Sequence, residues 1–342
     1  MGEFDLIRRY FTRPTPNAVL GVGDDCALLR LGPGMQMAVS TDMLVAGRHF
    51  FPDVDPRTLG HKALAVNLSD LAACGARPMA FTLALALPDT NTNWLHAFSQ
   101  GLLALADAHG CELVGGDTTR GPLNICLTVL GEVPAGTTAR AGQPATQALL
   151  RGGAQAGDDL YVSGTLGDAR LALEALQGRL ALPDAVLASA RQRLECPTPR
   201  VALGMALRGI ASAAADISDG LLGDLGHILE RSAVGATVDT HIAIELLASY
   251  VDLTRARSLF DQQLLQETAL RCVLGGGDDY ELVFTASPAQ RAAVQGASIA
   301  SATPLTRIGK IDAEPGLRLV DAQGATVLNT FASLTTSTLS AP

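Results

Sequence analysis

Residues 55–87 read DPRTLGHKALAVNLSDLAACGARPMAFTLALAL, and this stretch indicates how the first half of the chain folds. Asp55 suits the N-cap of a helix, and the proline that follows suits the first helical turn, where a missing N–H costs nothing. The apolar helical pattern predicts a helix that ends at Gly75. The mostly apolar segment from Thr82 to Leu87 is predicted to form a strand. A predicted helix is thus followed directly by a predicted strand.

Strand-like and helix-like segments continue to alternate on both sides of this stretch. We expect further helices over 95–110 and 220–231, and strands over 37–39, 112–114, 123–129, 160–163, 213–217 and 280–285, with two more between 307 and 320. Periodicity is lost over 134–157, which is rich in Gly, Ala, Thr and Pro. The sequence therefore predicts an N-terminal domain over 1–137, a linker over 138–157 and a C-terminal domain over 158–342.

Composition excludes several classes of function. The 342 residues are 48% hydrophobic and carry a formal net charge of −9, which argues against nucleic acid and anionic membranes as partners. The longest apolar run, 79–87, is about half of the ~20 residues that a membrane span needs, and the N-terminus lacks the apolar core of a signal peptide. Six scattered cysteines without a C-x-x-C pair predict reduced thiols in a cytoplasmic protein.

The aspartates carry the chemical signal. They recur where an apolar strand is expected to meet a loop, at Asp24 and Asp25, Asp42, Asp117, Asp216 and Asp219, and Asp278 and Asp279. Strand ends are where sheet proteins build ligand sites. Each aspartate taken singly also suits a helix cap or a turn.

Asp70 is harder to explain as a cap or a turn residue. It lies in a predicted helix that is apolar nearly all round, and a buried carboxylate needs a partner. That partner is either an Arg or Lys in a salt bridge, or a metal ion, and the surrounding acids favour the metal. Oxygen ligands without His or Cys clusters indicate Mg²⁺, Mn²⁺ or Ca²⁺, and not zinc. Divalent ions would also let an acidic protein bind nucleotides, although the common phosphate-binding and kinase motifs are missing.

Six blocks of the sequence, in order, resemble the thiamine-monophosphate kinase family, which belongs to the superfamily of aminoimidazole ribonucleotide synthetase and selenophosphate synthetase. The blocks are GVGDDCALL (21–29), STDMLVAGRHF (40–50), residues 62–76, GGDT (115–118), DISDGL (216–221) and GGDDYEL (276–282). The resemblance runs from Gly2 to about residue 320. It implies that ATP and thiamine monophosphate give ADP and thiamine diphosphate.

The resemblance also implies an architecture and a set of site residues. The expected fold is a two-domain α/β (α+β) architecture in which each domain is a mixed sheet packed with helices. Its active-site cleft is expected between the domains and the partner of a homodimer joined through the N-terminal domains. Several Mg²⁺ ions are expected at Asp25, Ser40, Thr41, Asp42, Asp70, Asp117, Asp216 and Asp219, ATP at Gly116, Asp117, Arg151 and Ser218, and thiamine monophosphate at His49, Asp278 and Phe331.

Three features depart from the family pattern. Asp278 stands where the family usually has Glu, and its side chain is one methylene shorter. Residues 141–150 resemble an insertion, so Arg151 is placed by the R-G-G-A-x-x-G-D pattern that begins at it. Phe331 is the nearest candidate for the aromatic residue expected beside the thiamine.

The chemistry predicts direct transfer without a covalent nucleophile. The acceptor is a phosphate monoester whose second pKa lies near 6, so its attacking oxygen is mostly ionised at neutral pH. Metal ions held by residues such as Asp42 and Asp117 would neutralise the repulsion between two polyanions. The alternatives are another ATP-using enzyme of the superfamily, or a non-catalytic protein that binds thiamine diphosphate or metal on this fold.

Overall fold

The computed structural model describes residues 3–137, 145–255 and 262–331. The chain divides into two compact units, and each is described here by itself. Of the described residues, unit 1 holds 3–71 and 75–148, and unit 2 holds 72–74 and 149–331. No helix in these described ranges is long and apolar enough to cross a bilayer.

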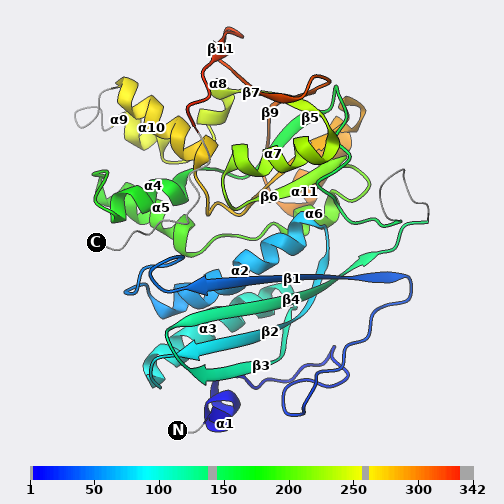
Figure 1. Cartoon of the computed structure of the whole chain (residues 1–342), viewed down its shortest axis with the longest axis vertical. Helices are drawn as coiled ribbons and strands as arrows, with labels where there is room; N and C mark the ends of the chain where they lie inside the picture. The colour runs from blue at the N-terminus through cyan, green and yellow to red at the C-terminus, as the bar shows by residue number, and fades with distance from the viewer. Residues whose placement is uncertain (1–2, 138–144, 256–261, 332–342) are drawn as a thin grey trace. The chain divides into compact units, whose positions relative to one another are not determined.

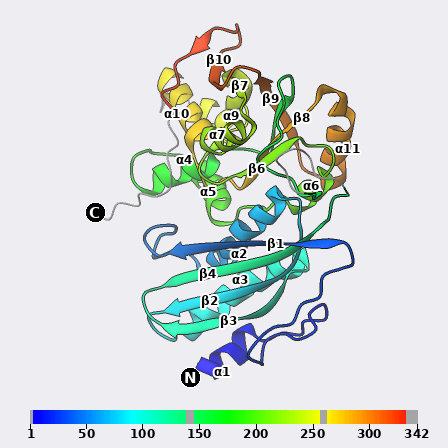
Figure 2. The same cartoon turned by 45° about the vertical axis from the view of Figure 1, so that its right-hand side comes forward.

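Unit 1 is a four-stranded mixed sheet with helices on one side (Figure 1). Its strands are β1 (Met35–Val45), β2 (Arg77–Leu87), β3 (Glu112–Arg120) and β4 (Asn124–Pro134), in the order β1-β4-β2-β3. β4 runs antiparallel to β1 and β2, whereas β2 and β3 are parallel. The helical segments are α1 (Glu3–Leu6), the π-helix η1 (Ile7–Phe11), α2 (Pro56–Ala73) and α3 (Thr92–His109). Figure 2 shows from another side that α2 and α3 cover the same face of the sheet.

Helix α3 ends where the sequence predicts but begins three residues before the expected start at residue 95. The side chain of Asn91 caps the N-terminus, because it accepts hydrogen bonds from the backbone N–H groups of Asn93 and Trp94. Gly110 ends the helix in the left-handed conformation. Its apolar side chains recur at helical spacing and are buried: Leu95, Phe98, Leu102 and Leu105. Helical spacing thus places one apolar face of α3 in the core.

Two glycines let α2 and α3 cross at backbone contact. A Cβ atom on Gly60 would lie 2.1 Å from the carbonyl oxygen of Phe98, and one on Gly101 would lie 1.8 Å from that of Arg57. Both distances are far below van der Waals contact. No side chain fits at either position, so the two helices approach as closely as their backbones allow.

The strands extend further than predicted. β1 was expected to end before Ser40 but continues to Val45, because it pairs with β4 along its whole length, from Met35 opposite Pro134 to Val45 opposite Asn124. Asp42 therefore lies inside a strand, and so does Asp117 within β3. The expectation that these two acids follow strand ends was wrong. Ladder hydrogen bonds satisfy the backbone of polar residues as well as of apolar ones.

Unit 2 contains a seven-stranded mixed sheet in the order β11-β10-β7-β9-β5-β8-β6. Its strands are β5 (Asp159–Ser163), β6 (Ala213–Ile217), β7 (Gly235–Asp239), β8 (Glu281–Ala286), β9 (Leu305–Asp312), β10 (Gly316–Val320) and β11 (Thr326–Val327). Its helices are α4 (Asp168–Leu176), α5 (Asp184–Glu195), α6 (Val201–Ala206), α7 (Leu221–Ser232), α8 (Thr240–Ile244), α9 (Tyr250–Arg255), α10 (Gln262–Gly275), the 3₁₀ turn η2 (Pro288–Gln290) and α11 (Arg291–Ser301).

The centre of unit 2 is apolar. Every residue of β5 and β8, and of the edge strand β6, is buried, as is typical of strands whose two faces are both covered. The mixed sheets and their helices confirm the predicted α/β (α+β) class. Of the segment expected to be an insertion, residues 141–144 lie outside the described residues.

Candidate functional site

The first group of predicted site residues joins β1 to α2. The hydroxyl of Ser40 donates to the carboxylate of Asp70, and the backbone N–H of Asp42 donates to Oδ1 of Asn67 at 3.2 Å. Burial and, secondarily, the charge of Asp70 raise the pKa of Asp42 from 3.8 to about 6. Three of the predicted metal ligands, Ser40, Asp42 and Asp70, thus meet on the helix-covered face of the sheet.

Thr41 and His49 lie near this group without joining it. Thr41 points to the opposite face of the sheet, since side chains alternate along a strand, and its hydroxyl lies 2.9 Å from that of Thr128. His49 follows β1, and its Nδ1 accepts the backbone N–H of Val45 at 3.0 Å. This hydrogen bond orients the imidazole at the end of β1.

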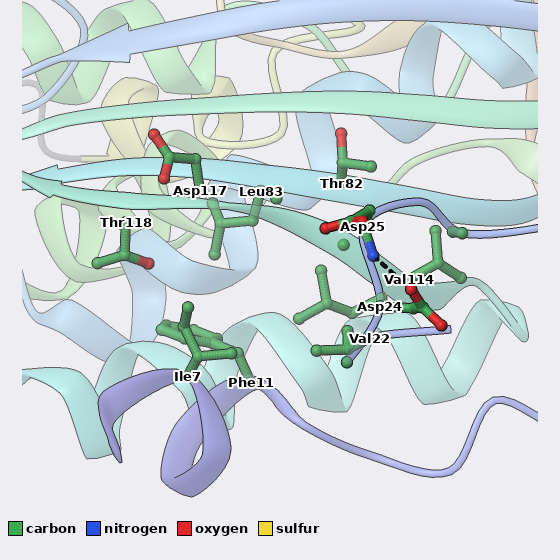
Figure 3. Close-up of a pocket in the computed structure, with 15 residues that line it drawn as sticks. Ile7, Phe11, Val22, Asp24, Asp25, Thr82, Leu83, Val114, Asp117 and Thr118 are labelled. Carbon is green, nitrogen blue, oxygen red and sulfur yellow. Dashed lines mark hydrogen bonds between the residues drawn. The ribbon is translucent and has the colours of Figure 1, made fainter. Parts of the chain in front are cut away.

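A second group lines a pocket at the β3 edge of unit 1. The pocket has a volume of about 590 Å³, a size typical of small-molecule sites. Asp24, Asp25, Gly116 and Asp117 contribute polar groups, and the backbone N–H of Asp25 donates to Oδ1 of Asp24 at 2.9 Å. Figure 3 shows Asp117 and Thr82 pointing to one side of the sheet, away from the helical turn that carries Ile7 and Phe11.

The apolar lining of this pocket was not foreseen from the sequence. Ile7, Phe11, Val22, Leu113 and Val114 all contribute to it. Isolated apolar side chains in a sequence indicate a core, and these residues share no helical or strand period that would single them out. The combination of an apolar floor with a few polar groups is typical of a ligand site.

Gly116 brings backbone into close contact at the pocket. Its φ is +145°, and a Cβ atom here would lie 1.9 Å from the carbonyl oxygen of Leu83. Only glycine adopts this φ readily and has no Cβ atom to collide with the carbonyl of Leu83. The backbone beside Asp117 is therefore fixed against β2.

The two groups of unit 1 are separated by the width of the sheet. Asp42 lies opposite Leu127, Leu127 opposite Leu83, and Leu83 opposite Gly116. Three strand spacings amount to roughly 14 Å between the backbones of Asp42 and Gly116. Asp117 comes one residue after Gly116, so its side chain points to the open face while that of Asp42 points to the helices.

The third group lies in unit 2, where β6 meets α7. Asp216 is buried near the end of β6, Ser218 is half-buried and Asp219 is exposed. The carboxylate of Asp224 accepts the backbone N–H groups of Ser218 and Asp219, both at 3.0 Å. Burial raises the pKa of Asp224 to about 6 in spite of these two donors. Asp224 was not predicted, because an acid in the first turn of a helix is common without any further role.

Asp278 is tied to the same turn. Its backbone N–H donates to the carbonyl of Ser218 at 2.9 Å, and its Oδ1 accepts the hydroxyl of Tyr280 at 3.3 Å. The φ angles of Asp278 and Tyr280 are +68° and +51°, in the left-handed region that non-glycine residues seldom occupy. The predicted residues Ser218, Asp219 and Asp278 thus belong to two adjoining loops, and Asp216 lies in β6 just before the first of them.

Arg151 and Phe331 stand apart from these hydrogen bonds. Arg151 is exposed in the segment before β5, and its carbonyl accepts the hydroxyl of Ser232 at 3.4 Å. Phe331 is half-buried at the end of the last described range, and its backbone N–H donates to Oδ1 of Asn329 at 3.3 Å.

The predicted acids therefore form three groups, two in unit 1 and one in unit 2. Within the described ranges, no three His, Cys, Asp or Glu side chains lie close enough together to form a metal site of their own. Protein carboxylates in such numbers fit a divalent ion that completes its coordination with water and phosphate oxygens.

Comparison with known proteins places the whole chain in one family. Residues 23–133 match the N-terminal domain of the AIR synthase related proteins, and residues 155–322 match their C-terminal domain. The chain is 46% identical over 324 residues to the thiamine-monophosphate kinase of Salmonella typhimurium strain LT2, covering 93% of each sequence.

Solved structures agree with this result. The crystal structure of thiamine-monophosphate kinase from Stenotrophomonas maltophilia K279a superposes with a TM-score of 0.78 at 45% identity, covering 95% of this chain and 96% of that one. A structure described as AaThiL complexed with AMPPCP and TMP superposes with a TM-score of 0.71 at 26% identity, covering 95% and 93%. The chain belongs to the thiamine-monophosphate kinase family, among the AIR synthase related proteins.

Proposed function

We propose that this protein catalyses the ATP-dependent phosphorylation of thiamine monophosphate to thiamine diphosphate, the last step in making that cofactor. The observation that carries the proposal is the 46% identity to a thiamine-monophosphate kinase over 93% of both chains. A fold relative was solved with AMPPCP, an analogue of ATP, and with TMP, which supports the same pair of substrates.

Mg²⁺ ions fit the first group of acids. Asp42 and Asp70 offer carboxylate oxygens and Ser40 a hydroxyl, all of them donors that Mg²⁺ prefers. Burial and, secondarily, the charge of Asp70 raise the pKa of Asp42, and a divalent cation bound there would favour the ionised carboxylates. We propose Asp25, Thr41, Asp117, Asp216 and Asp219 as further ligands. Bound Mg²⁺ would neutralise the negative charge of the phosphates.

The pocket at the β3 edge fits the nucleotide. Its apolar floor suits a flat base, and the backbone fixed at Gly116 lets a phosphate approach main-chain groups closely. Asp25 and Asp117 at the same pocket would reach the phosphates through Mg²⁺. We propose Arg151 and Ser218 as further contacts of the ATP phosphates.

Three residues would bind thiamine monophosphate, the phosphoryl acceptor, and position it for in-line attack. We assign His49 to its phosphate end, Asp278 to its cationic ring and Phe331 to stacking against that ring. The acceptor phosphate is already ionised at neutral pH, so none of these residues needs to remove a proton. Asp42 and Asp117 act in this scheme as ligands, and no phosphorylated enzyme forms.

The open face of the unit 1 sheet supports a homodimer. Val39 and Met43 on β1 are 58% and 52% exposed, and Met37 is 43% exposed. Large apolar side chains gathered on one sheet face are typical of an interaction surface. We propose that a second copy of the chain covers this face, and that the dimer is cytoplasmic, as the scattered cysteines indicate.

Release of ADP by the purified protein tests the function. We expect ADP and thiamine diphosphate to form in equal amounts, only when ATP, Mg²⁺ and thiamine monophosphate are all present, and EDTA to stop the reaction. A metal-dependent rise in melting temperature without ADP release would instead indicate the non-catalytic alternative. ADP release that does not depend on thiamine monophosphate would point to another ATP-using enzyme of the superfamily.

A further inference from the structure

Behind the Asp278 loop, unit 2 contains a fully buried carboxylate with two arginine partners. Glu281 has no exposed surface. It accepts the hydroxyl of Ser163 at 2.6 Å and Nη2 of Arg193 at 2.9 Å, and it accepts Nε of Arg200 at 2.6 Å. A buried carboxylate is stable only with such partners, so the group fixes the start of β8.

The two arginines differ in what else they reach. The side chain of Arg200 binds Glu281 through two nitrogens in a bidentate pair. Nη2 of Arg193 also lies 3.4 Å from the carbonyl oxygen of Thr165 and 3.5 Å from that of Asp279. Burial raises the pKa of the Asp279 carboxylate well above its usual value, and the N–H of Gly167 and the positive charge of Arg193 oppose that rise. Arg193 alone of the two links the buried Glu281 to the backbone of the loop.

The loop that carries Asp278 holds an unfavourable backbone conformation, and it lies next to Ser218. Asp278 and Tyr280 both have positive φ, and such backbone persists only where the surroundings determine it. The backbone N–H of Tyr280 donates to Ile217 at 2.9 Å, and that of Asp278 donates to Ser218 at 2.9 Å. The carboxylate of Asp279 accepts the N–H of Gly167, where α4 begins.

We propose that Arg193 is a positioning residue for the substrate-side loop over 276–280. Its guanidinium holds the carbonyl of Asp279 and the carboxylate of Glu281 together. This contact sets the direction of the Asp278 side chain, which comes directly before Asp279, toward the acceptor. The planar guanidinium can serve several acceptors at once, whereas a lysine ammonium in its place cannot hold the same geometry. The inference rests on the proposed function, because it concerns how that reaction's acceptor is bound.

Steady-state kinetics of Arg193→Lys and Arg200→Lys test the inference in the full-length protein. Arg200→Lys is the matched control, because it makes the same change to the other partner of Glu281. We expect Arg193→Lys to raise the KM for thiamine monophosphate by about tenfold or more, since a small misplacement of a substrate contact has effects of this size. The KM for ATP should stay within about twofold of wild type.

Hydrogen exchange supplies a second readout that does not depend on turnover. The amides of residues 278 and 280 should exchange faster in Arg193→Lys than in Arg200→Lys, because only the first substitution loosens the loop. If Arg193→Lys does not fold, Arg193→Gln, which can still donate to Glu281, takes its place in both measurements.

The outcomes separate this inference from the proposed function. A selective rise in the acceptor KM, together with faster exchange at 278 and 280, supports Arg193 as a positioning residue. The inference is overturned if the two lysine variants behave alike, for example if both only lower the melting temperature or if neither changes the KM for thiamine monophosphate. The proposed function would be unaffected by that result. A wild-type protein that releases no ADP with thiamine monophosphate overturns the function itself.

Discussion

Replacing Asp42 by Asn should make the metal-free protein more stable and the enzyme inactive. Burial and the neighbouring Asp70 raise the pKa of Asp42 from 3.8 to about 6. A shift of this size corresponds to roughly 3 kcal/mol of unfavourable free energy for the ionised carboxylate in the folded state. The amide of Asn carries no charge, and the hydrogen bond from the backbone N–H of residue 42 to Asn67 does not involve the substituted group.

The sign of the pH dependence follows from the direction of this shift. Because the folded-state pKa lies above the unfolded value, the contribution of Asp42 to stability is fully present below pH 3.8 and is lost as the pH rises through about 6. At pH 7 in EDTA, Asp42→Asn should therefore be about 1–3 kcal/mol more stable than wild type. Near pH 4 the difference should nearly vanish, since Asp42 is then largely protonated.

Urea denaturation of both proteins in EDTA at pH 4 and pH 7 measures the effect. Asp53→Asn makes the same chemical change at an exposed position and should leave the unfolding midpoint unchanged at both pH values. Added Mg²⁺ should stabilise the wild type and not Asp42→Asn if this carboxylate is a ligand. An Asp42→Asn variant that is less stable than wild type at pH 7, or equally shifted at both pH values, would refute the reasoning.

Three other substitutions have distinct expected results. Asp117→Asn should lose most turnover while keeping its melting temperature within a few degrees, because the side chain is exposed; near-normal activity at low Mg²⁺ in a kinetic assay would contradict its assignment as a ligand. Met43→Glu, which places a charge on the open sheet face where Met43 is 52% exposed, should shift the protein toward monomer in sedimentation experiments, and an unchanged dimer would exclude this face as the interface. Glu281→Gln should destabilise the fold by roughly 3 kcal/mol, because it leaves two largely buried arginines without their anion; thermal denaturation checks this, with Asp53→Asn again as the control.

Most elements of the chain could be predicted from local signals, whereas the fold class followed from the resemblance of the six sequence blocks to a known family. The end of α3 at Gly110 agrees with the helix expected over 95–110, whereas its cap at Asn91 was not predicted. The alternation of Ile125, Leu127 and Val129 gave the core face of β4 correctly. Such signals act over a few residues, and so a single sequence contains them in full.

Which face of the sheet each acid occupies depends on pairing between distant strands. The sequence shows Asp42 and Asp117 as equivalent acids after apolar segments. The pairing registers of the four strands place the Asp42 side chain on the face that the helices cover and the Asp117 side chain on the open face. A shift of one residue in any of these pairs would reverse that result, and nothing local to either aspartate specifies it.

Residues that support the site from behind carry even less local signal. Arg193 lies in a helix whose pattern suggests a solvated surface for any arginine, yet its side chain is only 20% exposed and reaches Glu281 across 88 positions of sequence. Phe11 and Val22 resemble ordinary core residues in the sequence, and both line the pocket, although Phe11 is also buried. Their roles come from tertiary contacts, which no spacing rule encodes.

The crossing of α2 and α3 has a consequence for the tolerance of this enzyme to mutation. Any side chain at Gly60 or Gly101 would push the two helices apart, since a first carbon atom there would meet backbone at 2.1 or 1.8 Å. Helix α2 carries Asp70, so its displacement would move a carboxylate that neither glycine touches. In a saturation screen for thiamine auxotrophy, both positions should accept no substitution, although neither has any reactive group to lose.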